Sequence, residues 1–322
     1  MSPRTRSALR VPALLAGVAL LVGACSTGPA APERPEKTSI TVTGLPIVDV
    51  APLHLAQQQG LFAQQGLDVT IKPLTSSNQS LPGLADGSVD IVAGGNYVTF
   101  FEAQARKETD IRVVAEAALA SPGLDQVVTS PRSGITDPRQ LAGRTVAVNT
   151  PAPNIQTLTL NRVLASRGVD PASVRYVTMP FAQSVTALDS GGVDAAWLVE
   201  PFVTQAEQSI GALPLVDPTS GPTDAFPLDG YFTTARFAAQ YPATIAAFRR
   251  ALSQASERAA DDEQVTSSLP SYTPISATTA GILTLPEYPS TLQPRRLQRV
   301  ADLMTQAGMI PDRLDTSSLA VR

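Results

Sequence analysis

The sequence predicts an α/β protein of two lobes, each a mostly parallel sheet flanked by helices, joined by a two-strand hinge. Short apolar runs alternate with segments of helical spacing, which is the order of parallel sheets wound with helices. A helix-to-strand corner occurs twice, as LADGSVD ending at Asp90 and as LDSGGVD ending at Asp194, 104 positions later. About 285 residues follow residue 37, which is near the size at which one core divides in two.

The N-terminus has the features of an export signal followed by a lipid anchor. Three arginines precede an apolar stretch, residues 11–22, that is too short to span a bilayer. The segment LVGAC, which ends at Cys25, resembles a bacterial lipobox. We therefore expect residues 1–24 to be removed and Cys25 to be lipidated; the alternative is an ordinary signal peptide before a chance cysteine. Residues 25–37 are rich in proline and charge, which predicts a solvated tether on the outer face of the cell membrane.

Composition and single residues argue against several classes of function. The formal net charge is −4 and no basic run occurs, so nucleic acid is not an expected partner. Cys25 is the only cysteine, and the only histidine, His54, lies in an apolar helix start where packing or a rim position is expected. With no P-loop, GxSxG or His/Cys cluster, we expect no cofactor, no metal and no catalytic residues. Asp49 and Glu200 are carboxylates that could do acid–base work if they approach each other, but no nucleophile accompanies them.

The first copy of the repeat is predicted to run strand, helix, strand, helix, strand. A helix is expected over residues 52–65, and a shorter helix ends at Gly87. The strands are expected over residues 40–44, 69–73 and 89–93.

The second copy repeats this order. A helix is expected over residues 154–167, and a further helix places Phe181 on its core face. The strands are expected over residues 145–149, 174–179 and 193–198. Glycines stand where the helices of both copies should stop, as left-handed caps: Gly66, Gly87, Gly168 and Gly191.

The remaining segments complete the two lobes. Strands are expected over residues 111–115, 126–129 and 231–234, and helices from residue 242 onward and over 294–307. We expect the first lobe to comprise residues 38–121 and 235–322, and the second lobe residues 122–234. The chain then crosses twice between the lobes, and two crossings form a hinge around a closing cleft.

Several short motifs follow one another in an order typical of one protein family. They are APLHLA at 51–56, GLF at 60–62, GLDV at 66–69, LAGRTVAV at 141–148, GVD at 168–170, GGVDAA at 191–196 and EPF at 200–202. With these motifs the chain resembles, over roughly residues 40–260, the ABC-importer solute-binding proteins of the sulfonate, nitrate, taurine and thiamine-pyrimidine-precursor family. The resemblance implies the two-lobed type II periplasmic-binding fold.

The resemblance also implies a function. It describes a monomeric, extracytoplasmic lipoprotein that captures a small polar organic ligand by cleft closure and delivers it to ABC permease and ATPase subunits. Two alternatives stay open from the sequence. One is a membrane-tethered sensor that uses the same cleft, and the other is an exported enzyme of the pyrimidine-synthase type, which shares the fold.

The expected ligand site follows from the strand ends, because open α/β sheets bind ligands outside the carboxyl ends of their strands. The repeat places Asn96 opposite Glu200, so we expect both to face the ligand; the alternative for Glu200 is a local cap. Trp197 either stacks on the ligand or belongs to the core. Tyr97 likewise either faces the ligand or does not, and the sequence does not decide. The expected ligand-binding residues are Pro46, Asp49, Ser76, Ser77, Asn78, Gly94, Gly95, Asn96, Tyr97, Asn149, Thr150, Trp197 and Glu200.

The expected wall of the cleft has few positive charges, which bears on the ligand. Sulfonates and nitrate would be met by hydroxyls, amides and arginine, whereas Glu200 and Asp49 repel an anion and accept hydrogen bonds from N–H groups. These residues favour a neutral or amine-bearing ligand such as a pyrimidine, or a zwitterion such as taurine. The family resemblance favours sulfonate-like compounds, and the sequence does not decide between them.

Overall fold

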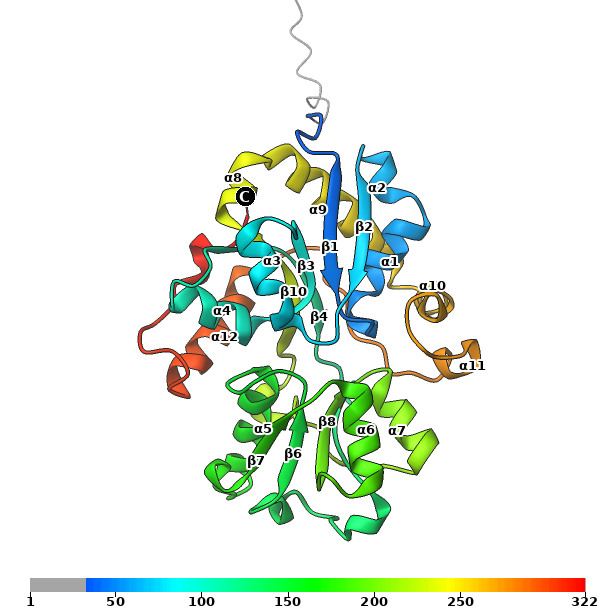
Figure 1. Cartoon of the computed structure of the whole chain (residues 1–322), viewed down its shortest axis with the longest axis vertical. Helices are drawn as coiled ribbons and strands as arrows, with labels where there is room; N and C mark the ends of the chain where they lie inside the picture. The colour runs from blue at the N-terminus through cyan, green and yellow to red at the C-terminus, as the bar shows by residue number, and fades with distance from the viewer. Residues whose placement is uncertain (1–32, 322) are drawn as a thin grey trace, which may run out of the picture. The chain divides into compact units, whose positions relative to one another are not determined.

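The computed structural model describes residues 33–321. The expected export signal, Cys25 and residues 25–32 of the expected tether lie outside the described residues. Arg34–Arg322 form one compact unit, and this unit contains two five-stranded sheets (Figure 1). Within residues 33–321, no helix combines the length and the apolar character needed to cross a membrane.

The first sheet has the strand order β2-β1-β3-β10-β4. Strand β1 pairs parallel with β2 and β3, and β10, from much later in the chain, pairs antiparallel with β3 and β4. The strands are β1 (Ser39–Gly44), β2 (Asp68–Pro73), β3 (Ile91–Asn96), β4 (Ile111–Leu119) and β10 (Pro227–Thr234).

Helices cover both faces of the first sheet, and together with it they form the first lobe (Figure 1). Neighbouring residues of β3 point to opposite faces, as the twofold period of a strand requires. Ile91 packs in the cluster that includes α1, α2 and α9, whereas Val92 packs in the cluster that includes α4 and α12. The helices of this lobe are α1 (Ala51–Gln58), α2 (Leu61–Gln64), α3 (Leu81–Asp86), α4 (Tyr97–Ala105), α8 (Ala235–Gln240), α9 (Pro242–Arg258), α10 (Asp262–Ser268), α11 (Ala277–Ala280) and α12 (Pro294–Gln306).

The second sheet, β7-β6-β8-β5-β9, repeats the plan of the first. In both sheets the second, first and third strands of a repeat copy lie side by side in parallel, and an antiparallel strand follows the third. The elements of this second lobe are β5 (Asp125–Thr129), β6 (Thr145–Val148), α5 (Ile155–Ser166), β7 (Arg175–Thr178), α6 (Phe181–Ser190), β8 (Ala195–Val199), α7 (Phe202–Ile210) and β9 (Leu213–Val216).

The chain crosses between the sheets through residues 120–124 and 217–226. The second crossing differs from the expected lobe boundary at residue 234, because β10 belongs to the first sheet. All eight residues of β10 are buried between β3 and β4, and this long-range pairing fixes the strand in the first sheet. Only its last part, residues 231–234, was expected as a strand.

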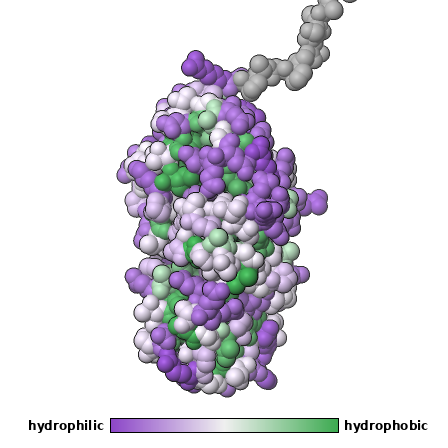
Figure 2. All heavy atoms as spheres, turned by 90° about the vertical axis from the view of Figure 1, so that its right-hand side faces the viewer, coloured by the Kyte–Doolittle hydropathy of each residue, from purple (hydrophilic) through white to green (hydrophobic). Residues whose placement is uncertain are grey.

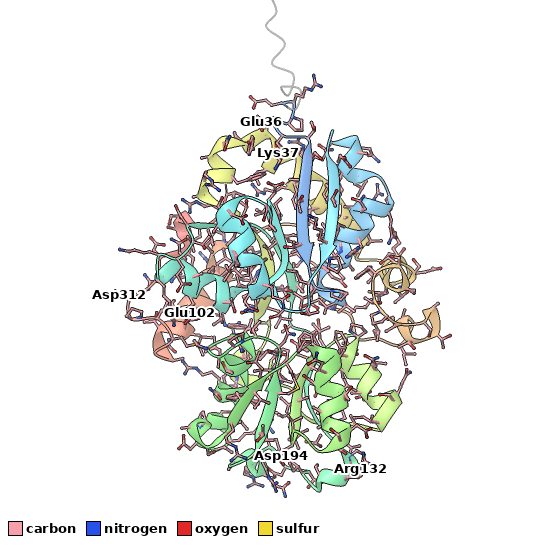
Figure 3. The ribbon with its side chains drawn as sticks, in the orientation of Figure 1. Glu36, Lys37, Glu102, Arg132, Asp194 and Asp312 are labelled. Carbon is pink, nitrogen blue, oxygen red and sulfur yellow. The ribbon has the colours of Figure 1, made fainter. Side chains whose placement is uncertain are left out.

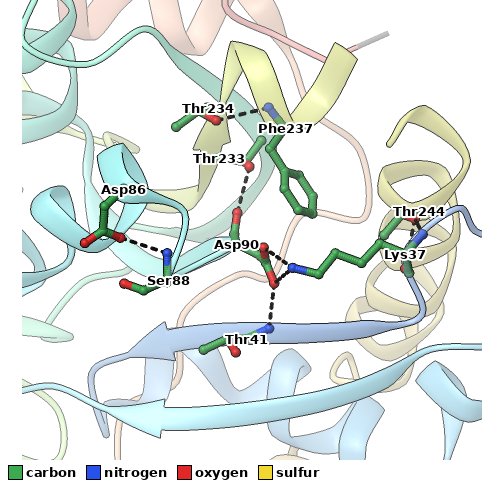
Figure 4. A network of polar contacts seen from close by, with 9 residues as sticks. All are labelled: Lys37, Thr41, Asp86, Ser88, Asp90, Thr233, Thr234, Phe237 and Thr244. Carbon is green, nitrogen blue, oxygen red and sulfur yellow. Dashed lines mark hydrogen bonds and ion pairs between the residues drawn. The ribbon is translucent and has the colours of Figure 1, made fainter. Parts of the chain in front are cut away.

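In each lobe, an aspartate of the repeated corner makes the same two hydrogen bonds to the start of the first strand of its copy. The Asp90 backbone N–H donates to Thr41 O (3.0 Å), and the Asp90 carboxylate accepts from Thr41 N (2.9 Å) (Figure 4). In the second copy, Asp194 makes the same two bonds to Thr145, at 2.9 and 2.8 Å. Lys37 pairs with Asp90 at 2.6 Å and Arg144 pairs with Asp194 at 3.1 Å. In Figure 3 the labelled Lys37 and Asp194 lie at opposite ends of the drawing, far from the junction of the two sheets.

Most predicted elements are confirmed within a few residues, and the differences have local causes. The helix expected over residues 52–65 is divided into α1 and α2 by Gly60, whose φ is 67°. The predicted helix stops are confirmed, since their φ angles are 77°, 84°, 77° and 75° at Gly66, Gly87, Gly168 and Gly191. Helices α4, α7, α8, α10 and α11 and strand β9 were not predicted.

The last residues of the expected tether are part of the fold. The Glu36 carboxylate accepts hydrogen bonds from the backbone N–H groups of Ala243 and Thr244, both at 2.9 Å, at the start of α9. The Lys37 backbone N–H donates to Thr244 Oγ1 at 3.0 Å. Residues 36 and 37 are therefore fixed to the first lobe (Figure 3).

Large apolar side chains are mostly buried in the described part of the chain. Leu213 and Ile282 are the exposed large hydrophobic residues within it, at 48% and 61% exposure. Figure 2 accordingly shows a face on which hydrophobic side chains are scattered among hydrophilic ones. His54 stacks on Tyr272 with ring centroids 3.6 Å apart, and burial lowers its pKa to about 4. This histidine therefore has a packing role, which is one of the two alternatives expected from the sequence.

Candidate ligand site between the two sheets

A cavity lies between the two sheets. The space open to the centre of a water-sized sphere is about 50 Å³, which leaves room for a small organic group. The first lobe contributes Leu45, Ile47, Asp49, Ser77, Gly94, Asn96, Leu228 and Asp229. The second lobe contributes Asp125, Asn149, Thr150, Ile155, Gln156, Phe181, Trp197 and Val199.

The lining is built mainly from residues at or just after the carboxyl ends of parallel strands. Asp49 lies in a 3-10 turn shortly after β1, Gly94 lies in the last part of β3, and Asn149 follows β6 directly. Gly94 meets two needs at once, because its φ is 66° and a Cβ there would lie 2.9 Å from Val50 Cγ1. The site thus forms where the parallel strands of open α/β sheets present their ends.

Hydrogen bonds join the two lobes beside the cavity. The Asn149 side chain donates to Thr75 O at 2.9 Å, and Ser76 Oγ lies 3.2 Å from Asn149 O. The Val48 backbone N–H donates to Glu200 O at 3.3 Å. Because these bonds join residues of different lobes, the structure corresponds to a closed arrangement of the cleft.

Three buried aspartates dominate the electrostatics of the cavity. Asp49, Asp125 and Asp229 are 2%, 0% and 4% exposed. Burial raises the pKa of Asp49 to about 7, although a hydrogen bond with Asp229 acts in the opposite direction. Burial, together with the neighbouring carboxylates, raises the pKa of both Asp125 and Asp229 well above the usual range. The cavity therefore concentrates carboxyl groups whose charged form is disfavoured.

None of the sixteen lining residues is lysine, arginine or histidine. The three aspartates also form no ion pair with the described residues 33–321. In the same part of the chain, no group of three or more His, Cys, Asp or Glu is arranged to hold a metal ion. Within the described residues, the aspartates thus have no cationic partner and are not arranged as a metal site.

Comparison with protein families gives a match over residues 47–265, to the family described as NMT1/THI5 like. The chain belongs to the NMT1/THI5-like family. The family resemblance predicted from the sequence is therefore confirmed.

Three relatives of this NMT1/THI5-like chain show the range of proteins it is similar to. The alkanesulfonate-binding protein SsuA from Xanthomonas axonopodis pv. citri, bound to MOPS, has a TM-score of 0.74 and 21% identity, covering 88% of this chain and 98% of that one. The desulfurization enzyme DSZB has a TM-score of 0.63 and 16% identity, covering 88% and 96%. At these identities the likeness concerns the fold, which is confirmed as the α/β periplasmic-binding type.

The third relative is similar in sequence. The bicarbonate transport ATP-binding protein CmpC of Synechocystis sp. (strain ATCC 27184 / PCC 6803 / Kazusa) is 30% identical over 188 residues. These are 53% of this chain but 28% of that protein, so the chain matches less than a third of its relative's length.

The structure brings seven of the thirteen expected residues to the cavity wall. They are Asp49, Ser77, Gly94, Asn96, Asn149, Thr150 and Trp197. Six expected residues are absent from the wall: Pro46, Ser76, Asn78, Gly95, Tyr97 and Glu200.

Two of these six residues belong to the core of the first lobe. A Cβ at Gly95 would lie 2.6 Å from Phe100 Cε2, because this residue points to the face opposite the cavity. Tyr97 is fully buried, with its ring 5.5 Å from those of Phe101 and Phe232. The strand period, which places Gly94 and Gly95 on opposite faces, accounts for Gly95, whereas Tyr97 begins α4 and packs in the core with that helix.

Glu200 takes the alternative role of a local cap. Its carboxylate accepts hydrogen bonds from Thr204 N at 3.1 Å and Thr204 Oγ1 at 2.8 Å. Asn96 Oδ1 accepts from Thr99 N at 3.0 Å, so both repeat positions satisfy a backbone N–H in the first turn of the next helix. Asn96 additionally lines the cavity and donates to Ser77 Oγ at 3.2 Å. The repeat thus relates two helix caps, of which one reaches the site.

Ser76 and Asn78 stand next to the cavity and connect elements around it. Ser76 Oγ contacts both Asn78 Oδ1 and the backbone oxygen of Asn149. Pro46 is half-buried and outside the wall.

Sequence reasoning missed Asp125 and Asp229, although a signal was present. Each aspartate follows a leucine inside a short apolar segment, LDQVV at the start of β5 and LDGYF within β10. A charged residue within a buried strand is rare without a partner. That pattern, read in both segments, would have pointed to a second and third carboxyl. Phe181, expected in the core, also reaches the wall, and it stacks on Phe202 at 5.3 Å.

Proposed function

We propose that this chain is an extracytoplasmic solute-binding lipoprotein of an ABC importer, which captures a small polar organic ligand and delivers it to a permease. The observation that carries the proposal is the cavity between the two sheets, which is lined in equal numbers by residues of both lobes. Membership of the NMT1/THI5-like family and the likeness to an alkanesulfonate-binding protein support it. The bicarbonate-transport relative supports the link to ABC import.

The mechanism we propose is a shift between open and closed arrangements. In an open form both walls are accessible, and a ligand that touches both walls stabilises the closed form by its differential affinity. The bonds of Asn149 to Thr75 and of Val48 to Glu200 form only when the lobes approach. A permease then recognises the closed form.

Binding is favoured over catalysis by the chemistry of the wall. The hydroxyl of Ser77 accepts a hydrogen bond from Asn96, and among residues 33–321 no histidine or cysteine lines the cavity to activate it. The buried carboxyls are candidate proton donors, but the hydroxyls of Ser77 and Thr150 beside them have no histidine or cysteine partner among the described lining residues. A membrane-tethered sensor would use the same cavity, and loss of ligand uptake in cells that lack this chain would distinguish import from sensing.

The proposal is tested by thermal unfolding of the mature chain against taurine, alkanesulfonates, nitrate, hydroxymethylpyrimidine and riboflavin. A ligand at a hundredfold its dissociation constant stabilises the folded state by about 2.7 kcal/mol. At roughly 2–4 °C per kcal/mol, we expect at least one compound to raise the midpoint clearly.

A cavity-filling variant provides the control. Leu228→Phe enlarges a lining side chain into empty space, so it should keep the fold and abolish the ligand-induced shift. Leu303→Phe, a half-buried change on α12 outside the cavity, should keep the shift. Equal shifts in both variants would place the binding site elsewhere, and a panel that moves nothing would count against the proposed function.

A further inference from the structure

The cavity has an unusual balance of unsatisfied hydrogen-bonding groups. Within the described residues, four buried carboxyl oxygens on its wall lack a partner: Oδ1 of Asp49, Oδ1 of Asp229 and both oxygens of Asp125. One donor on the wall also lacks a partner, Trp197 Nε1, in a side chain that is 2% exposed. Buried polar groups are normally paired, so these groups point to a ligand that supplies the missing partners.

The amide side chains of Gln156 and Asn96 on the wall are already occupied. The Gln156 side chain accepts from Asn149 N at 2.6 Å and donates to Trp197 O at 3.1 Å. Asn96 caps α4 and donates to Ser77. The groups left for a ligand are therefore the four carboxyl oxygens, which accept hydrogen bonds and carry or can carry negative charge, the Trp197 N–H, and the hydroxyls of Ser77 and Thr150.

The carboxyls converge from three separate elements. Asp49 comes from the turn after β1, Asp229 from β10 and Asp125 from β5 of the other lobe. A buried carboxylate without a partner is costly, and the lining residues that the structure describes include no cation. The described residues also hold no arrangement suited to a metal ion, which leaves an organic cation as the natural partner.

We infer that the cavity binds a small organic cation whose charged group carries several N–H donors, such as an amidinium or guanidinium, with Asp125 as its main partner. Two parallel N–H groups match the two free oxygens of one carboxylate, which is the geometry of strong bidentate pairs. The rings of Trp197 and Phe181 on the same wall suit a planar cation. The inference rests on the proposed binding role of the same cavity, and it sets this chain apart from its alkanesulfonate-binding relative.

Two matched pairs of compounds test the inference on the mature chain. Methylguanidinium and methylurea have nearly the same shape, and so do benzamidinium and benzamide, but only the first of each pair is charged. Calorimetric titration at pH 8 and constant ionic strength should give at least one cation a dissociation constant tenfold or more below that of its neutral partner. Methanesulfonate and nitrate should not bind measurably.

The variant Asp125→Asn assigns the effect to the carboxylate. It should reduce the preference of cation over neutral partner to twofold or less. Because asparagine replaces a buried carboxyl that has no partner among the described residues, the unliganded midpoint of the variant should not fall below that of the wild type. Glu102→Gln removes a half-buried carboxyl of α4, outside the cavity, and should leave the preference unchanged.

The outcomes separate the inference from the proposed function. Binding of methanesulfonate or nitrate without binding of either cation would overturn the inference and leave the proposed function standing. Neutral and cationic partners that bind equally to the wild type would also overturn it. If no compound of either charge binds, the inference and the proposed function both lose their support.

Discussion

At the residue scale, burial sets the chemistry of Asp49. An aspartate in the unfolded chain has a pKa near 3.8, whereas burial raises that of Asp49 to about 7 in the folded protein. The pKa of Glu200 is likewise raised to about 7, first by burial. Both groups hold a proton more tightly in the folded state than in the unfolded chain.

This difference predicts how stability changes with pH. Since the folded pKa of Asp49 is the higher one, its contribution to stability is fully present below about pH 4 and is lost as the pH rises through 7. We expect the free energy of unfolding of the unliganded protein to fall by about 2–4 kcal/mol between pH 5 and pH 8. Asp49→Asn should reduce this fall, and urea unfolding at pH 5, 6, 7 and 8 measures it. The exposed Asp110→Asn serves as control; a stability that rises over this range would contradict the prediction.

At the scale of elements, the two copies of the repeated corner fix the starts of β1 and β6 through the same hydrogen bonds. Asp90 and Asp194 make the same backbone bonds, but the Asp90 side chain is 5% exposed and that of Asp194 is 29% exposed. A bond to a charged group is worth more where water is excluded. The two copies should therefore contribute unequally to stability.

Alanine variants at the two corners measure this inequality. We expect Asp90→Ala to lower the free energy of unfolding by about 2–3 kcal/mol, because it leaves Thr41 N without its acceptor and Lys37 without its partner. Asp194→Ala should cost about 1 kcal/mol. Chemical denaturation gives both values, and Lys37→Ala combined with Asp90→Ala isolates the ion pair. Equal losses in the free energy of unfolding at the two positions would show that exposure does not determine how much each aspartate contributes.

Elements with a clear local pattern could be predicted from the sequence, and those defined by distant contacts could not. The helix stops at Gly87 and Gly191 depend on one residue's conformation, so the sequence carries them. Helix α4 has a nearly continuous buried apolar run, which looks like a buried strand without further information. Asp229 reaches the cavity through the pairing of β10 between β3 and β4, a long-range contact that no local pattern encodes.

At the scale of the whole molecule, closure depends on contacts that lie outside the cavity as well as on its wall. Leu45 and Ile47 of the first lobe pack in the core cluster of the second lobe. Ile155 and Leu158 of α5 pack in a cluster of the first lobe. The Arg162 side chain, also on α5, donates to Leu303 O at 3.4 Å and Gln306 Oε1 at 3.3 Å on α12.

Arg162 tests closure without touching the ligand site. Loss of its bonds, together worth about 1 kcal/mol, should shift the equilibrium toward the open form about fivefold. Arg162→Ala should therefore enlarge the radius of gyration of the unliganded protein in small-angle X-ray scattering, and weaken the binding of any ligand by up to the same factor. Arg167→Ala, an exposed change just after the same helix, should do neither. An unchanged radius for Arg162→Ala would mean that these bonds do not hold the cleft closed.

The attachment of Glu36 and Lys37 to the first lobe has a mechanical consequence. Glu36 bonds to the start of α9, and Lys37 bonds to Thr244 and to Asp90, so the chain arriving from the N-terminal side is clamped before β1 begins. With the proposed anchor at Cys25, a pull along that chain is borne by the first lobe and is not transmitted through the hinge. The first lobe is then the fixed part of the molecule and the second lobe the moving part. Tension on the membrane attachment therefore does not load the hinge about which the ligand drives closure.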